Sequence, residues 1–299
     1  MIRARVRCTI LASLLLLATV AAADLLENDK TAVDQLSGMS AGEFKALMAS
    51  AAKGRSSAQA LLAIAYLKGI HVDKNVRAAF DLFAKAAKKN QPVAMNNLGL
   101  MYFFGEGTAK NYPEALRCFR AASERGSADA QFNLALMYHH GYGVPVDTSE
   151  AAKWYEIAAR QGDVRAQNVL ATLYENGDGV AKDQGQALKW FKKAADSRYA
   201  MAQFNLGIHY LEEYDHPAAM HWFLLAANQG NSAAARNLIA LYLHGDADKL
   251  NYREAYRWLV RIHGSDPWFT EKLQLCRQHL SKTDLDEIET TASVATNAN

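Results

Sequence analysis

Cysteine and proline are both scarce in this sequence, with 3 and 5 residues respectively in a chain of 299. So few cysteines exclude a small disulfide-built scaffold, and so little proline, with only 18 glycines, excludes collagen-like and low-complexity disordered chains. Excess charge of one sign is also missing, because 33 basic residues stand against 31 acidic ones. Binding to nucleic acid or to an anionic membrane through bulk charge is therefore not expected.

A long apolar run occurs only at the N-terminus. Three arginines within the first seven residues precede the run Cys8–Val20, and Ala21–Ala23 then precedes the acidic Asp24. This order is typical of a secretory signal peptide, and the run is shorter than the roughly 20 apolar residues that a membrane-spanning helix needs. We predict a signal peptide at residues 1–23 and a mature chain exported to the periplasm or outside of a bacterium, without an integral membrane segment. A retained N-terminal anchor is the alternative.

The rest of the sequence repeats with a period of about 36 residues. Six alanines, set in register, are spaced by 36, 36, 36, 36 and 32 residues. Leucine follows each alanine by four residues and tyrosine by eight: Ala58, Ala94, Ala130, Ala166, Ala202, Ala234; Leu62, Leu98, Leu134, Leu170, Leu206, Leu238; Tyr66, Tyr102, Tyr138, Tyr174, Tyr210, Tyr242. Offsets of four and eight place these side chains on one face of a helix, which we call helix A of each copy.

A second helix, helix B, follows in each copy. It is preceded by Asn or Asp, the short polar residues that cap helix N-termini: Asn75, Asn111, Asp147, Asp183, Asp215, Asn251. Its inner face pairs an alanine with a large apolar residue four positions later: Ala79, Ala115, Ala151, Ala187, Ala219, Ala255; Phe83, Phe119, Tyr155, Phe191, Phe223, Leu259. Two helices with one apolar face each are not stable alone, so neighbouring copies must stack into an all-α solenoid.

A Gly-x-Gly turn joins the two helices in copies two, three and four. The glycine pairs are Gly105 with Gly107, Gly141 with Gly143, and Gly177 with Gly179. Glycine permits the positive φ that ends a helix and reverses the chain, so the turn is predicted to be structural. His71 stands at the second glycine position of copy one, and the turn of copy five is four residues shorter.

The repeat resembles a known family. The segment ADAQFNLALMYHHGYGV from Ala128, followed by AAKWYEIAARQG from Ala151, is similar to the Sel1-like repeat, a longer relative of the tetratricopeptide repeat. The resemblance covers about residues 55–266. It implies right-handed stacking of helix pairs and a concave surface that holds other proteins.

The predicted organisation places capping segments around the repeats. Ser40–Lys53 matches helix B alone, and Pro267 begins a further helix after copy six. The predicted parts are a signal peptide at 1–23, a flexible leader at 24–39, an N-terminal capping helix at 40–54, six repeats at about 55–90, 91–126, 127–162, 163–198, 199–230 and 231–266, C-terminal capping helices at 267–292, and a disordered tail at 293–299.

Motifs of catalysis are missing. The chain has no Gly-x-Ser-x-Gly elbow and no His-Glu-x-x-His pair, so we predict neither an enzyme nor a cofactor. His139, His140 and His244 fall at helix A ends with Glu175 and Glu212, but adjacent copies lie too far apart to share one ion, so no metal site is predicted. Some Sel1-like proteins with a cysteine pair in every repeat are linked to penicillin binding or β-lactam hydrolysis. This chain lacks those pairs, and a cell-wall or β-lactam-acting hydrolase stays as an alternative.

The candidate binding residues lie on helix A. Asparagines at one register position can hydrogen-bond the main chain of an extended peptide, or they can brace the neighbouring helix; both interpretations stay open. Phenylalanine and arginine vary at a neighbouring position and can line a partly apolar strip or belong to the core. The predicted partner-binding residues are Asn97, Asn133, Asn205, Asn237, Phe132, Phe204 and Arg236.

The predicted function is a protein-binding scaffold in cell-envelope assembly, signalling or host contact. The partner is another protein or an extended peptide. A peptidoglycan or glycan binder is the other alternative, because exposed aromatic rings stack on sugars. Its candidate residues are Phe103, Phe104, Phe132 and Tyr142.

Overall fold

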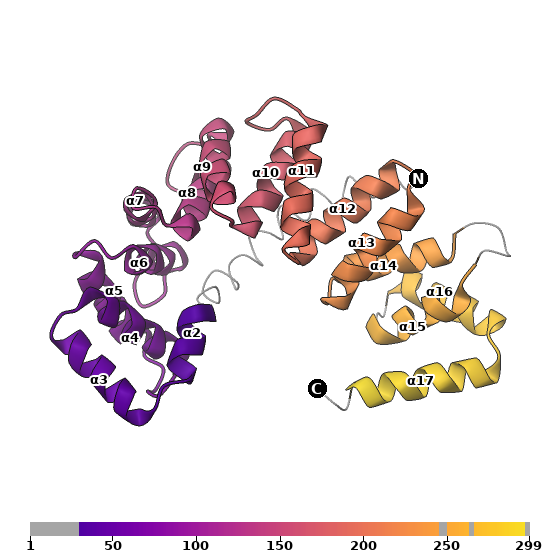
Figure 1. Cartoon of the computed structure of the whole chain (residues 1–299), viewed down its shortest axis with the longest axis horizontal. Helices are drawn as coiled ribbons and strands as arrows, with labels where there is room; N and C mark the ends of the chain where they lie inside the picture. Colours follow the sequence, from indigo (N-terminus) through magenta and orange to yellow (C-terminus); the bar gives the residue numbers. More distant parts are fainter. Residues whose placement is uncertain (1–29, 245–249, 263–265, 297–299) are drawn as a thin grey trace. The chain divides into compact units, whose positions relative to one another are not determined.

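The computed structural model describes residues 30–244, 250–262 and 266–296, and within these ranges it contains 16 α-helices and no strand (Figure 1). The all-α fold class predicted from the repeats is confirmed. The predicted signal peptide at 1–23 lies outside the described residues. Over the described ranges, no helix combines the length and the apolar composition needed to cross a membrane.

Each copy of the repeat contributes one helix A and one helix B. Helices A are α4 (Ser56–Lys68), α6 (Pro92–Phe104), α8 (Ala128–His140), α10 (Val164–Asn176), α12 (Ala200–Glu212) and α14 (Ser232–Tyr242). Helices B are α5 (Val76–Ala87), α7 (Tyr112–Ser123), α9 (Thr148–Arg160), α11 (Gln184–Asp196), α13 (His216–Asn228) and α15 (Tyr252–Ile262). Helices outside the repeats are α2 (Lys30–Ser37), α3 (Ala41–Ala52), α16 (Pro267–His279) and α17 (Lys282–Thr296).

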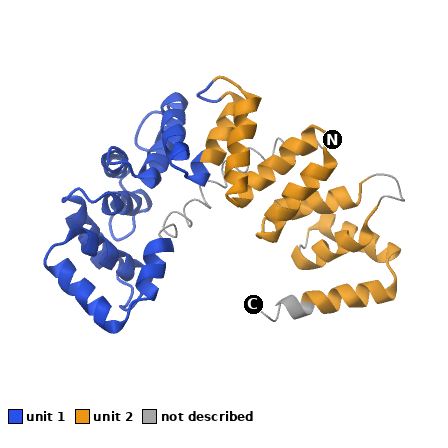
Figure 2. Ribbon diagram, viewed as in Figure 1, with its two compact units in different colours: residues 1–166, 178–180 blue, residues 167–177, 181–299 orange. Residues whose placement is uncertain are grey.

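The chain divides into two compact units, which Figure 2 colours separately. Unit 1 comprises residues 1–166 and 178–180, and unit 2 comprises residues 167–177 and 181–299. Consecutive helices pack against each other from α4 to α9 in unit 1 and from α11 to α16 in unit 2. Helix B of one copy thus packs against helix A of the next, which makes each unit a stack of repeats, as in an α-solenoid.

The core of each copy pairs a small residue with a large one. The six alanines that begin the inner face of helix B are at most 1% exposed, and the aromatic or leucine residues four positions later are at most 2% exposed. The leucine column of helix A is at most 6% exposed. Alanine lets the helices approach closely while the large side chain fills the remaining space, and each buried ring contributes about 1.5 to 3 kcal/mol.

The predicted caps begin all six helices B. In each copy the Asn or Asp side chain accepts a hydrogen bond from the backbone N–H three residues later, at 2.9 to 3.1 Å. The backbone N–H of the same residue donates to the carbonyl of the column tyrosine in helix A. Copy five closes this second bond across a shorter turn, from Asp215 to Tyr210 at 2.9 Å. The same two bonds therefore fix helix A to helix B whatever the turn length.

The second glycine of the turn is required by close packing as well as by its positive φ. A Cβ added at Gly143 would lie 2.9 Å from the Cβ of Tyr112, at the start of helix B in the preceding copy. No copy precedes the first one, and His71 occupies this position there with a φ of 60°. Its Nε2 lies 2.8 Å from the carbonyl oxygen of Leu36, and its ring centroid lies 4.9 Å from that of Phe44. A side chain is tolerated here because it contacts α2 and α3 instead of another repeat.

The structure differs from the sequence prediction at both ends. Residues 24–39 were expected to be a flexible leader, but helix α2 forms over Lys30–Ser37, and Leu36 is fully buried in the core of unit 1. Ser40 and Glu43 form a capping box at the start of α3. Helix α17 continues to Thr296, past the predicted end at residue 292 and into the segment predicted to be disordered. Residues 24–29 and 297–299 lie outside the described ranges.

Candidate functional site

Two asparagines of the predicted binding column connect neighbouring helices A. Asn133 of α8 donates through Nδ2 to Oδ1 of Asn96 in the preceding copy at 2.8 Å. Asn205 of α12 makes the same bond to Asn168 at 2.9 Å. Asn133 is 3% exposed, and Asn205 is half buried. These side chains brace adjacent helices, and the amide group of each already donates one hydrogen bond within the stack.

The other two asparagines of the column bond within their own helix. Asn97 and Asn237 each donate to the carbonyl four residues earlier, at 2.9 Å, and both are half buried. At the position where Asn96 and Asn168 stand, the copies preceding these two carry Ala60 and Phe204, which offer no side-chain acceptor. The inter-helix bond therefore forms where the preceding copy supplies an asparagine.

Phe132 and Phe204 are core residues. They are 1% and 7% exposed, and their ring centroids lie 5.5 Å from Tyr155 and 5.9 Å from Phe223, in helix B of the same copy. Burial against another ring removes more apolar surface from water than an open groove would. Of the two interpretations left open for Phe132 and Phe204, a partly apolar strip or the core, the structure supports the core. Asn133 was predicted to contact a partner or to brace the neighbouring helix, and it is enclosed in the second of these roles.

Arg236 is exposed on unit 2 and connects α14 to the start of α16. Its guanidinium group forms an ion pair with Asp266, the N-cap of α16, and lies 5.2 Å from the ring centroid of Trp268. The hydrogen bond from Arg236 lowers the pKa of Asp266, and the backbone N–H of Phe269 adds to this effect. The charge of Arg236 is thus paired with a residue of the same unit.

A glutamine column that the sequence analysis did not predict forms a second network, which is buried at the column and exposed at its outer members. Gln59, Gln131 and Gln203 each donate to a backbone carbonyl eight residues earlier, at the end of the preceding helix, at 3.2 to 3.4 Å. Gln161 and Gln229 then donate to the side-chain oxygens of Gln131 and Gln203 at 2.6 and 2.7 Å. The sequence carries a signal for this column, because glutamine directly follows the register alanine in four of six copies.

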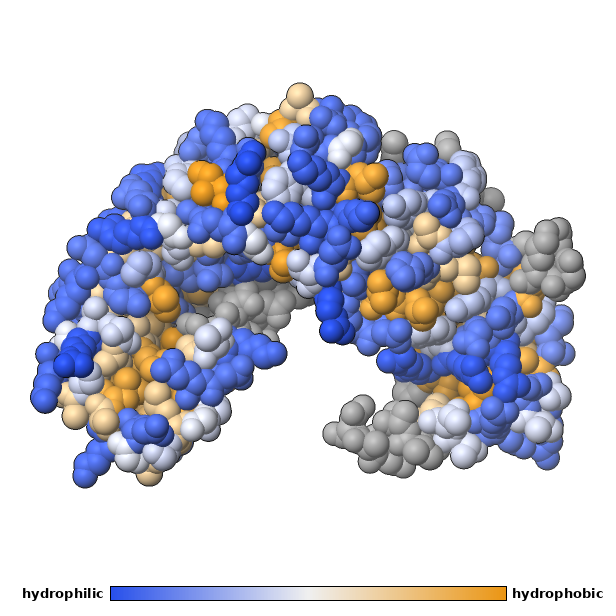
Figure 3. Space-filling model, in the orientation of Figure 1, coloured by the Kyte–Doolittle hydropathy of each residue, from blue (hydrophilic) through white to orange (hydrophobic). Residues whose placement is uncertain are grey.

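Four partly exposed aromatic residues form a cluster in unit 1, which we call the aromatic cluster: Phe103, Phe104, Tyr112 and Tyr142. The ring centroid of Phe103 lies 5.0 Å from Phe104, 5.1 Å from Tyr112 and 5.1 Å from Tyr142. The end of α6, the start of α7 and the turn after α8 bring these rings together. Hydrophobic residues gather in separate patches on the mostly hydrophilic face in Figure 3. Three of the four rings, Phe103, Phe104 and Tyr142, are among the candidate glycan-binding residues predicted from the sequence.

Two histidines extend the aromatic cluster at the end of α8. The rings of His139 and His140 stack with centroids 4.8 Å apart, and His140 lies 5.6 Å from Tyr142. Burial lowers the pKa of His139, although the carboxylate of Asp178, 3.8 Å from its Nε2, opposes the shift. Burial also lowers the pKa of His140, and the neighbouring His139 adds to that effect. Both rings are therefore neutral at pH 7.

The stability of unit 1 is expected to fall as the pH drops below about 6.5, the ordinary histidine pKa. The unfolded chain takes up protons on His139 and His140 from that pH downward, whereas the folded chain resists until its lowered pKa values are reached. Urea midpoints measured between pH 7.5 and pH 5 should therefore decrease, and this slope should shrink in the variant His139→Gln/His140→Gln. An unchanged slope in that variant would assign the dependence to other groups.

A metal-binding cluster and a reactive thiol are both missing from the described residues. Among them, no group of three or more His, Cys, Asp or Glu side chains is placed to hold a metal ion. Cys118 and Cys276 are free and buried, and burial raises the pKa of each thiol to about 11. A thiol with so high a pKa is protonated at neutral pH and is a weak nucleophile.

The family comparison agrees with the repeat seen in the structure. The model of the Sel1 repeat matches residues 56–91, 92–127, 128–163, 164–199, 200–231 and 233–261. The chain belongs to the Sel1 repeat family. The resemblance stated from the sequence is confirmed, and the helix pairs described above are Sel1 repeats. No curated protein matches the chain.

Two solved Sel1 structures resemble this one. The crystal structure of a Sel1 repeat protein from Oxalobacter formigenes is 34% identical, with a TM-score of 0.64, and the match covers 69% of this chain and 86% of that one. The second is a protective antigen present in uropathogenic Escherichia coli strains, displaying an SLR fold, with 27% identity and a TM-score of 0.64. The match covers 82% of this chain but 62% of the antigen, so this chain spans less than two thirds of that relative.

Proposed function

We propose that this Sel1 repeat protein is a non-catalytic scaffold that binds another protein through the aromatic cluster of unit 1. The observation that carries the proposal is the arrangement of four partly exposed rings around Phe103. Aromatic residues supply most of the binding energy at many protein interfaces, because large rigid rings bury much surface at low entropic cost. Side chains of the asparagine and glutamine columns form hydrogen bonds within the stack of helices. We therefore place the partner-binding surface at the aromatic cluster instead.

We further propose that the chain acts outside the cytoplasm, in the periplasm or beyond it. The basic start, the apolar run and the three alanines before Asp24 support export. The Escherichia coli relative is a protective antigen, which is consistent with an exposed location for proteins of this kind. Cell-envelope assembly, signalling and host contact all fit a scaffold there.

The proposed function predicts loss of a partner when the aromatic cluster is truncated. The chain from Asp24 would be crosslinked in intact cells, purified, and compared with the variant Phe103→Ala/Tyr142→Ala. Removing two central rings should weaken capture at least tenfold, since hot-spot truncation typically costs more than 1.4 kcal/mol. The captured partner would be identified by mass spectrometry.

The matched control removes a different ring pair from unit 1. Phe80 and Tyr102 are also half buried and in edge contact, with centroids 5.4 Å apart, so Phe80→Ala/Tyr102→Ala tests for general loss of structure. Capture that survives in the control and disappears in the cluster variant supports the proposal. If the two variants capture the same amount of partner, whether full or reduced, the aromatic cluster is not the binding surface.

A glycan ligand is the second candidate, and the same rings favour it. Tyr112 and Tyr142 carry hydroxyl groups beside apolar ring faces, and their centroids lie 5.3 Å apart. Rings of this kind can stack on a sugar and hydrogen-bond its hydroxyl groups. Cosedimentation of the chain with purified peptidoglycan, lost in the cluster variant while no protein is captured, would favour the glycan.

A further inference from the structure

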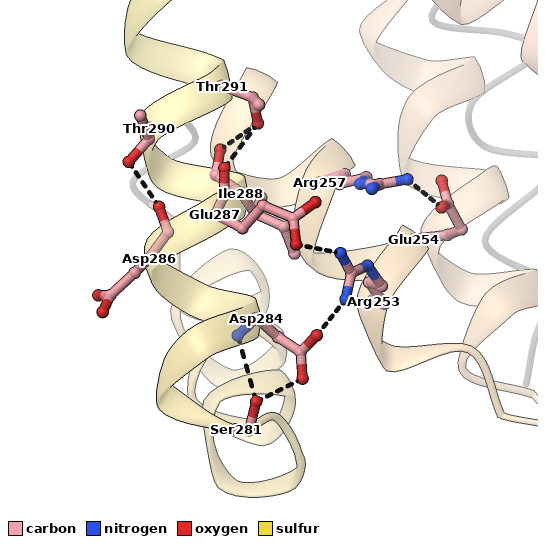
Figure 4. Close-up of polar contacts among 10 residues, drawn as sticks. All are labelled: Arg253, Glu254, Arg257, Ser281, Asp284, Asp286, Glu287, Ile288, Thr290 and Thr291. Atoms are coloured by element: carbon pink, nitrogen blue, oxygen red, sulfur yellow. Dashed lines mark hydrogen bonds and ion pairs between the residues drawn. The ribbon is translucent and has the colours of Figure 1, made fainter.

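The last helix of the chain, α17, is bound to α15 largely through charged side chains. Arg253 of α15 forms ion pairs with Asp284 and with Glu287, the latter at 2.6 Å (Figure 4). The guanidinium group thus spans two carboxylates one helical turn apart on α17. Arg257, on the next turn of α15, is not part of this contact, because it pairs with Glu254 of its own helix at 2.6 Å.

A second polar contact lies farther along α17. Glu289 accepts hydrogen bonds through Oε1 from the hydroxyl group of Tyr256 at 2.5 Å and from Arg277 of α16 at 3.2 Å. Arg277 also donates to the Tyr256 hydroxyl oxygen at 3.1 Å. Arg253, Tyr256 and Arg277 therefore form one donor surface, here called the arginine face, which receives three carboxylates from α17.

Few of the described side chains of α17 are apolar and buried. Ile288, 2% exposed, is the one buried residue among the described side chains of α17, whereas α15 buries Ala255, Tyr256, Trp258 and Leu259. The ion pairs are partly open to water: Glu287 and Glu289 have side chains 54% and 48% exposed. Exposed pairs are weak and are screened by salt. The described contacts of α17 are thus mainly ones that salt weakens.

The arginine face is chemically suited to an acidic helix. The segment 282–296 has four acidic residues and one basic residue, whereas α15 has three arginines and one glutamate. We propose that the arginine face binds an acidic helical segment of a partner protein, with carboxylates placed around one aliphatic side chain, and that α17 is an internal ligand which this segment displaces. The proposal rests on the scaffold function and adds a second contact surface, in unit 2, to the aromatic cluster of unit 1.

The test uses the full-length chain and a fluorescein-labelled synthetic peptide of residues 282–296 as the probe. In the variant Asp284→Arg/Glu287→Arg, reversed charges repel Arg253 and release α17, so the peptide should bind at least tenfold more tightly than it binds the wild-type chain. Adding Arg253→Ala to this variant should abolish the gain, because alanine removes the guanidinium group that binds the peptide without restoring a charge pair with α17. Raising the ionic strength from about 0.1 M to about 1 M should weaken peptide binding, because the Debye length falls from about 10 Å to about 3 Å.

Asp286→Arg is the positional control. Asp286 neighbours Glu287 in sequence but points away from Arg253 in Figure 4. This variant should bind the peptide as weakly as the wild-type chain does. If circular dichroism shows that the double variant has lost more helix than the 15 residues of α17 account for, the wild-type chain titrated with excess peptide decides, since exchange with α17 should still give saturable binding that Arg253→Glu removes.

Three results would overturn the proposal. The first is equal affinity of the peptide for the wild-type chain and the folded double variant, and the second is binding that survives Arg253→Ala in the double variant or Arg253→Glu in the wild-type chain. The third is a wild-type dimer that Arg253→Glu dissociates, which would assign the arginine face to α17 of a second copy. None of these depends on the aromatic cluster, so capture lost with Phe103→Ala/Tyr142→Ala would still support the scaffold function if peptide binding failed.

Discussion

Replacing Arg165 by alanine is expected to lower the free energy of unfolding by about 3 kcal/mol or more. Arg165 pairs with Asp163 at 2.5 Å and with Asp129 at 2.6 Å, and its guanidinium group lies 4.5 Å from the ring centroid of Phe132. The side chains of Arg165 and Asp163 are 15% and 6% exposed. Burial alone would lower the pKa of Arg165, but the bonds and charges of Asp163 and Asp129 outweigh it and raise the pKa. Urea unfolding followed by circular dichroism measures the loss.

The physical reason is the carboxylate that the substitution leaves behind. Without Arg165, Asp163 keeps a buried negative charge with no cation beside it, which costs more than the pair itself contributes. Arg165→Ala/Asp163→Asn should recover part of the loss, because Oδ1 of residue 163 caps α10 through the backbone N–H of Ala166 at 3.0 Å and asparagine caps equally well.

Arg160→Ala is the matched control for this prediction. Arg160 pairs with Glu156 at 2.6 Å in α9, the helix before the one that carries Arg165, but the two side chains are 69% and 36% exposed. An exposed pair contributes under about 1 kcal/mol, so this variant should be nearly as stable as the wild-type chain. If Arg165→Ala were no more destabilising than Arg160→Ala, the buried-charge argument would be wrong.

Local rules explain what could be predicted of the fold. The capping residues before helix B, such as Asn75 and Asp147, act within one helical turn, so their role follows from the sequence alone. The alanine and aromatic columns follow from helical periodicity, which the repeat presents six times. These patterns fix the helix pairs and their order.

The burial of the candidate binding residues could not be predicted from the sequence, because helix A of a solenoid is packed on more than one side. Periodicity placed Phe132 and Asn133 on helical faces but could not say that another helix covers each face. Asn133 meets Asn96 from 37 residues away, and the burial of both depends on the packing of two copies. The pairing of Arg253 with Asp284 is equally non-local, at a separation of 31 residues.

The second large expected effect concerns the turn of the fourth repeat. Gly179 has a φ of +70°, and a Cβ there would overlap the carbonyl group of Thr148 and lie 2.9 Å from the backbone nitrogen of Ser149. These atoms belong to the start of α9, so they cannot move aside as a flexible side chain could. Gly179→Ala should therefore destabilise unit 1 by about 3 kcal/mol, through a backbone clash added to the positive φ. Urea unfolding would measure this, and hydrogen exchange should show lost protection at the start of α9.

Gly126→Ala separates the clash from the backbone conformation. Gly126 has a similar φ of +81°, but no atom lies within 4 Å of the position that its Cβ would take. Its alanine variant bears only the cost of the left-handed conformation, about 1 kcal/mol. The difference between the two variants measures how closely one Sel1 repeat approaches the preceding helix B. Equal losses would mean that the second glycine is needed for its φ alone and that neighbouring repeats tolerate a methyl group at this contact.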